Sequence, residues 1–78
     1  MTTPGQRTEA TRRIFKALEA AEVGDLAAAY HMGVAIQTVW RWQKGERTPS
    51  PIYFEKLCAF AAGKGIGADG KPVHDAGK

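Results

Sequence analysis

The sequence predicts a single all-α domain of four or five short helices. Apolar residues recur at helical spacing in successive segments, glycine or proline bounds each segment, and no segment shows the alternation of a hairpin strand. Seventy-eight residues are enough for one small core but not for two. We therefore expect a compact domain over residues 8–62, with a flexible arm before it (1–7) and a flexible glycine-rich tail after it (63–78).

The composition is that of a globular protein, with 44% apolar and 24% charged residues. No apolar run approaches the roughly 18 residues of a membrane span, and the polar N-terminal segment lacks the hydrophobic stretch of a secretory signal. A single cysteine, Cys58, and two distant histidines form neither a disulfide framework nor a zinc site. We expect a cytoplasmic protein without metal or cofactor.

The charge balance is compatible with an anionic partner but does not require one. Eleven basic and eight acidic residues give a net charge of +3. The net charge alone therefore does not predict a function, and the functional prediction rests on sequence motifs.

The first predicted helix begins at Thr8, whose hydroxyl can cap the first free amides. Pro4 and Gly5 lie in a stretch without apolar periodicity, which indicates a flexible arm. The pattern ends before Gly24. One apolar face of this helix comprises Ile14, Phe15, Leu18 and Ala21.

Two shorter helices are predicted next. Asp25 opens a helix that runs to Met32 and is broken by Gly33, and a further helix over Ala35–Lys44 ends at Gly45. The β-branched residues and two tryptophans of the latter segment also fit a strand. Flanking glycines about three helical turns apart favour the helix.

A fourth helix is predicted from Ser50, with Pro51 at its first position, to about Ala62. Its expected core face comprises Phe54, Leu57, Cys58 and Ala61. The remaining sixteen residues hold five glycines and only scattered apolar side chains. Such a segment cannot bury enough surface to order itself alone, which predicts a flexible tail.

The spacing around Gly33 predicts a sharp corner between two closely packed helices. A small residue, Ala29, lies four positions before the glycine, and an apolar residue, Val39, lies six after it. Helices that cross steeply need a small residue at their closest approach, and glycine tolerates the positive φ of a tight corner. The seam is expected to comprise Ala28, Met32, Val34, Val39 and Trp42.

This pattern resembles the helix-turn-helix proteins of the phage repressor and Cro family. The residues that carry the resemblance are Ala28-Ala29, Met32-Gly33-Val34, Val39, Trp42, Lys44-Gly45 and the trailing Glu46-Arg47-Thr48-Pro49, and it covers about residues 24–50. It implies a transcription regulator, of phage or mobile-element type, that inserts the helix over 35–44 into the major groove of operator DNA.

The resemblance also implies which residues touch base edges: Ile36, Gln37, Trp40, Arg41 and Lys44. Gln37 suits a bidentate contact to adenine and Arg41 one to guanine, while Ile36 suits a thymine methyl. For Trp40 two interpretations stay open, packing on sugar and phosphate or covering the neighbouring helix. Trp42 is expected in the core, because it follows Val39 by three positions on the buried side.

Phosphate contacts are expected from the hydroxyls and cations around that helix, namely Thr38, Arg47, Thr48, Arg12 and Arg13. Tyr53 and Phe60, seven positions apart, predict an apolar strip for a second copy, since two-fold proteins read paired half-sites. Alternatively these two rings cover Trp42 or the first helix. We expect a homodimer, at least on DNA.

No grouping of serine, histidine and carboxylate, and no phosphate-binding glycine loop, rises above chance, so we expect no enzyme activity. A rival hypothesis is a protein-interaction module, such as an antitoxin-like or inhibitory partner. Its support is the modest net charge, the acidic Asp25 at the start of the second helix, and the exposed aromatic residues. A third is an architectural DNA-binding protein without sequence preference.

Overall fold

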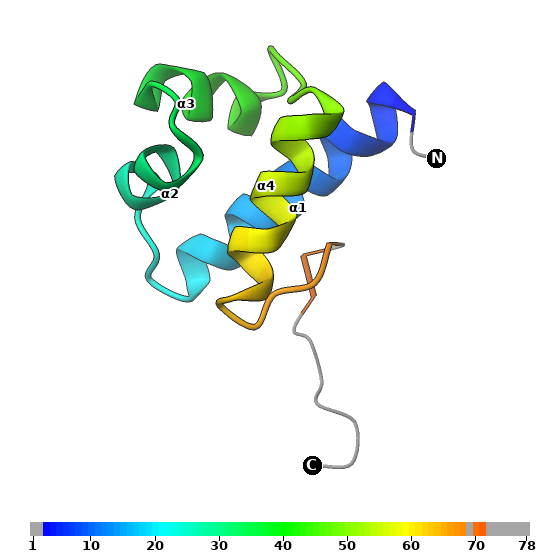
Figure 1. The fold of residues 1–78 in the computed structure, drawn as a ribbon. Helices are drawn as coiled ribbons and strands as arrows, with labels where there is room; N and C mark the ends of the chain where they lie inside the picture. Colours follow the sequence, from blue (N-terminus) through cyan, green and yellow to red (C-terminus); the bar gives the residue numbers. More distant parts are fainter. Residues whose placement is uncertain (1–2, 69, 72–78) are drawn as a thin grey trace.

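The computed structural model describes residues 3–68, 70 and 71, and these residues form a small all-α domain, as the sequence predicts. It has four helices, α1 (Pro4–Ala20), α2 (Asp25–Met32), α3 (Ile36–Lys44) and α4 (Pro51–Ala62), and the described part of the chain contains no strand (Figure 1). None of these helices is both long and apolar enough to cross a bilayer.

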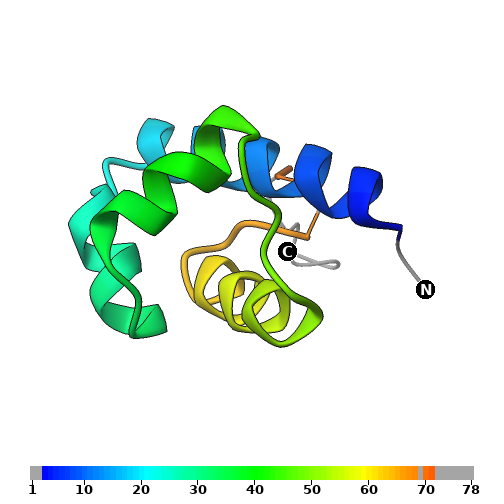
Figure 2. The ribbon, with the colours of Figure 1, turned by 90° about the horizontal axis from the view of Figure 1, so that it is seen from above.

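The helices close into a ring around one core. Helix α1 packs on α3 and α4, and α2 packs on the same two helices from the other side. Two views show α2 and α3 together beside the pair formed by α1 and α4 (Figures 1 and 2). The third helix is therefore held between α2, across the corner, and the long first helix.

The core is built from most of the predicted apolar faces, but Ala21 is an exception, because it is the exposed C-cap that follows α1. Trp42 is only 4% exposed, which confirms its place in the core. On α4, Leu57 and Ala61 are fully buried, whereas Phe54 and Cys58 are half-buried at the edge of the core. The buried apolar residues are Ile14, Phe15, Leu18, Ala28, Ala29, Met32, Val39, Trp42, Leu57, Ala61 and Ile66.

The corner between α2 and α3 has the geometry that its sequence predicts. Gly33 adopts a φ of +73°, in the left-handed region where side chains other than glycine are strained. The amide of Val34 donates to the carbonyl of Ala29 over 3.1 Å and so caps the end of α2. Three residues then suffice to reverse the chain into α3.

The first helix begins at Pro4, four residues before the predicted start, so the expected flexible arm over 1–7 is wrong for its described part. Thr3 is the N-cap: its hydroxyl accepts from the amide of Gln6 over 3.1 Å, and its own amide donates to the Gln6 side chain over 2.9 Å. Pro4 occupies the first helical position, where a missing N–H costs nothing. Thr8 is not a cap, because its hydroxyl donates to the carbonyl of Pro4.

The beginning of the predicted flexible tail also belongs to the fold. Ile66 is only 6% exposed, and its amide donates to the carbonyl of Ala61 over 2.9 Å. The chain then turns back, with the amide of Gly67 donating to the carbonyl of Lys71 over 2.7 Å. One buried isoleucine is enough to dock this segment on the core. The rest of the predicted tail, 69 and 72–78, lies outside the described residues.

Gly70 packs directly on the backbone of α1. A methyl group at Gly70 would lie 2.7 Å from the backbone of Arg13, and its φ is +81°. Gly65 has a similar φ of +79° but no atom within 4 Å of such a methyl group. Gly65→Ala therefore probes the conformational cost alone, whereas Gly70→Ala adds a steric clash.

We predict that Gly70→Ala lowers the free energy of unfolding by at least about 1 kcal/mol more than Gly65→Ala does, because overpacking adds to the left-handed strain. Urea denaturation of both variants and the wild type measures the difference. Equal losses for the two variants would show that residue 70 does not dock on α1.

Thr11 is the one buried polar side chain among the described residues, and its hydroxyl has no hydrogen-bond partner there. We predict that Thr11→Val raises the free energy of unfolding by about 1 kcal/mol, because it replaces an unsatisfied hydroxyl with a methyl group of similar shape. The matched variant Thr11→Ser keeps the hydroxyl and loses packing, so it should be destabilised. Urea denaturation tests both, and a loss of stability in Thr11→Val contradicts the prediction.

Candidate nucleic-acid interface

Helix α3 presents a polar, basic face to solvent. Val39 and Trp42 are its two buried side chains and hold it against the core. The opposite side carries Gln37, Trp40, Arg41 and Lys44, all exposed, and α3 contains no acidic residue. A short helix that is anchored on one side and free of carboxylates on the other is suited to approach a polyanion.

Two predicted base-contacting residues differ in how far they reach outward. Ile36 is half-buried and packs against the edge of the core, so it is not part of the exposed face. Trp40 is 45% exposed and so belongs to that face. Of the five residues predicted to touch bases, four are therefore exposed and one is partly used for packing.

A hollow of about 210 Å³ lies between α3 and the loop that leads to α4. Its lining brings together three residues that were predicted as phosphate contacts, Thr38, Arg47 and Thr48. Arg41, which was predicted to contact a base, lines the same hollow. The remaining lining residues are Trp42, Pro49 and Ser50. No carboxylate is among the lining residues, so the hollow is positively charged.

The loop that forms one wall of this hollow is tied to the start of α1. Nε of Arg7 donates to the carbonyl of Pro49 over 3.2 Å, and the hydroxyls of Thr8 and Thr48 hydrogen-bond to each other. Ser50 caps α4 by accepting from the amide of Tyr53 over 3.4 Å. The C-terminal end of the loop is thus held against α1 and by the cap of α4.

The two arginines of α1 that were predicted to contact phosphate lie in different places. The side chain of Arg12 lies about 4.0 Å from where a methyl group on Gly45 would stand, so it borders the end of α3. Arg13 forms an ion pair with Glu9 over 3.2 Å and lies next to Gly70, on the side of the C-terminal segment. Arg12 thus borders the C-terminal end of α3, and both arginines line a hollow that also includes Gln43 of α3.

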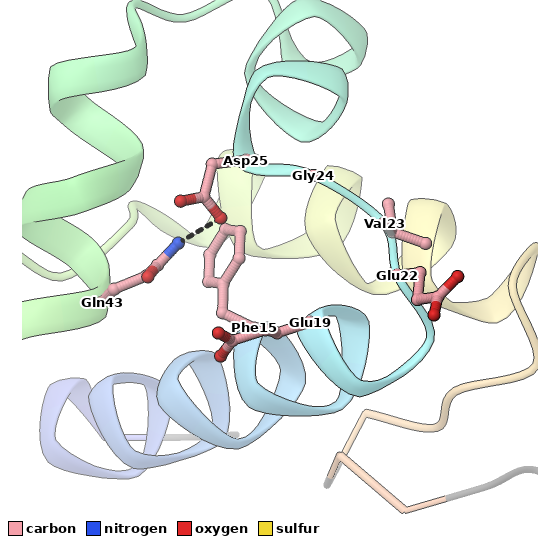
Figure 3. Close-up of a pocket in the computed structure, with 7 residues that line it drawn as sticks. All are labelled: Phe15, Glu19, Glu22, Val23, Gly24, Asp25 and Gln43. Atoms are coloured by element: carbon pink, nitrogen blue, oxygen red, sulfur yellow. Dashed lines mark hydrogen bonds between the residues drawn. The ribbon is translucent and has the colours of Figure 1, made fainter.

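The other flank of α3 is acidic. Glu19, Glu22 and Asp25 line a hollow of about 350 Å³ at the start of α2, with Phe15 as its apolar wall (Figure 3). Nε2 of Gln43 on α3 donates to Oδ1 of Asp25 over 2.8 Å (Figure 3). This hydrogen bond holds Asp25 against α3 and leaves a negative edge that repels phosphates. A neighbouring hollow, which shares Phe15, Glu19 and Gln43, also contains basic residues of α1, so the acidic character is confined to the start of α2.

The rings that were predicted to form a dimer strip both contact other rings of the same chain. The ring of Tyr53 lies 6.0 Å from that of Trp42, and the ring of Phe60 lies 4.7 Å from that of His31. Tyr53 thus covers Trp42, which agrees with the alternative interpretation for that residue. The ammonium groups of Lys56 and Lys64 lie 5.5 Å and 5.6 Å from the centres of the Tyr53 and Phe60 rings.

The cysteine of α4 is a packing residue. Burial raises the pKa of the Cys58 thiol, and the nearby carboxylate of Glu55 raises this pKa further. The thiol is thus less ionised, and less reactive, than an exposed one. In the described part of the chain, no group of three or more histidine, cysteine, aspartate or glutamate side chains is arranged to hold a metal ion.

Comparison with protein-family models, with curated proteins and with solved structures finds no match for this chain. The exposed face of α3 and the basic hollow beside it are therefore the observations on which a function can be proposed. One polar lining residue of that hollow, Ser50, was not predicted as a site residue. Arg7 does not line the hollow but holds the loop behind it through Pro49, a contact across 42 residues that no local sequence pattern signals.

Proposed function

We propose that this chain is a sequence-specific regulator of transcription that binds double-stranded DNA and is similar to the phage repressor and Cro proteins. The observation that carries the proposal is the exposed, acid-free face of α3, on which Gln37, Arg41 and Lys44 follow one another at helical spacing. Helix α3 follows a short corner after α2, and this is the arrangement that places a recognition helix in the major groove.

The chemistry of this face suits a reader of base edges. A glutamine such as Gln37 can pair with adenine through two hydrogen bonds, and lysine or arginine can pair with guanine. Each good bidentate pair contributes about 1–3 kcal/mol of discrimination. Arg47 and Thr48 lie beside α3 and are suited to hold the neighbouring phosphates. The regulator would act in the cytoplasm by occupying an operator, without metal or cofactor.

A homodimer on DNA stays a prediction. It follows from the observation that two-fold symmetric proteins read paired half-sites. A contact through Tyr53 and Phe60 would bring Lys56 and Lys64 of two copies towards one another, because each ammonium lies over one of these rings. Such like charges oppose association. DNA binding by α3 does not depend on this strip.

One observation favours the rival function, a module that binds another protein. Leu26 and Tyr30 lie one turn apart on α2 and are 68% and 88% exposed. An uncharged, strongly exposed pair of this kind is typical of surfaces that bind partners. Salt separates the two functions, since phosphate contacts make log affinity for DNA fall linearly with log salt concentration.

The proposal predicts that selection from a random duplex pool at physiological salt enriches one motif for the wild type. Gln37→Ala should lose or relax the preference at one base pair of that motif, because the contact to that base edge is removed. Lys64→Ala is the matched control: Lys64 is exposed just beyond the C-terminal end of α4, opposite the end that lies beside α3, and should leave the motif unchanged.

Three outcomes distinguish the hypotheses. No enrichment for the wild type contradicts DNA regulation and favours the interaction module. Binding without any motif, unaffected by Gln37→Ala, favours an architectural protein. A motif that Gln37→Ala leaves fully intact contradicts the assignment of this residue as a base contact.

A further inference from the structure

The hollow beside α3 contains two arginines and several hydroxyl groups. Contacts to base edges do not require such a group of residues in one hollow. Two arginines, Arg41 and Arg47, line this hollow of about 210 Å³ together with the hydroxyl-bearing residues Thr38, Thr48 and Ser50. Neither arginine is paired with a carboxylate in the part of the chain that the structure describes. Two like charges that line one hollow repel each other, and a bound anion would relieve that repulsion.

We propose that this hollow is a phosphate site and that Arg41 binds the backbone of the nucleic acid there instead of a guanine base. That the phosphate comes from a DNA strand rests on the proposed function. The existence of an anion site in the hollow does not. Base reading on α3 then falls to Gln37 and Lys44, with Trp40 beside them.

The angular positions of the side chains on α3 support this division. Gln37 and Lys44 are seven residues apart and so lie within about 20° of each other around the helix axis. Arg41 is rotated about 40° from Gln37, towards the side of Thr38, which lines the hollow. The guanidinium of Arg41 therefore leaves α3 on the flank that faces the loop.

The backbone brings the second arginine to the first. The amides of Glu46 and Arg47 both donate to the carbonyl of Arg41, over 3.0 Å and 3.4 Å. The loop therefore folds back over the last turn of α3, and Arg47 lines the same hollow as Arg41. A planar guanidinium forms paired hydrogen bonds with phosphate oxygens, which a lysine cannot form.

Two further features favour an anion over any other ligand. Helix α4 starts at the hollow, so the positive end of its dipole adds to the two charges. The hydroxyl of Ser50 accepts from the amide of Tyr53 and so keeps its own proton to donate. Because Arg7 and Thr8 hold the loop from behind, little ordering is needed when a phosphate binds.

The first test uses inorganic phosphate and the full chain, with backbone amide resonances as the readout. We expect saturable shifts at Thr38, Arg41 and residues 47–50, with an apparent Kd raised about tenfold or more in Arg41→Gln and unchanged in Lys64→Gln. Unaltered thermal unfolding of the variants checks the fold. The proposal is overturned if the wild type shows no saturable shift in the hollow, or if Arg41→Gln binds phosphate as well as the wild type.

The second test uses the duplex selected by the wild type and measures affinity against salt. Arg41→Gln should weaken binding to all sequences alike and reduce the slope of log affinity against log salt by about 1, whereas Arg41→Lys should keep the slope. Relaxed preference at a single base pair in Arg41→Gln overturns the assignment. A wild type that binds phosphate in the hollow but no duplex supports the site and removes the proposed function.

Discussion

The burial of Val39 and Trp42 determines the direction of α3, and the proposed interface depends on that direction. The helix has only nine residues, too few to be stable by itself in water, so its orientation comes from packing. Trp42 is also covered from outside by the ring of Tyr53, which links α3 to α4. These buried contacts orient α3 and so determine where each of its exposed side chains lies.

The distribution of charge beside α3 bears on where a polyanion can approach. On one flank the hollow between α3 and α4 carries two arginines, and on the other Asp25, Glu19 and Glu22 form an acidic edge. The hydrogen bond from Gln43 keeps Asp25 on that edge. In the proposed interface, a polyanion is therefore favoured at the hollow and disfavoured at the start of α2.

The parts of the fold that were predicted correctly have local signals. The corner at Gly33, the end of α3 and the cap at Ser50 each follow from a few adjacent residues. The start of α1 was missed because Pro4 and Gly5 were interpreted as helix breakers, although Thr3 and Gln6 form a reciprocal cap around them. The docking of Ile66 was missed because a single apolar residue among glycines has no periodicity. For the site, the exposed face of α3 was predictable, but the flank on which Arg41 lies depends on a loop whose supports are distant in sequence.

The hollow beside α3 depends on contacts between residues that are far apart in the sequence. Arg7 and Pro49 are 42 residues apart in the chain, and Thr8 and Thr48 are 40 apart. Contacts of such separation carry a large loop-closure entropy and form only once the intervening helices have ordered. The corner formed by α2 and α3 is local and can fold earlier, but the hollow is complete only when the first turn of α1 has docked on the loop. A nascent or partly unfolded chain would therefore have the corner and α3 without the completed hollow.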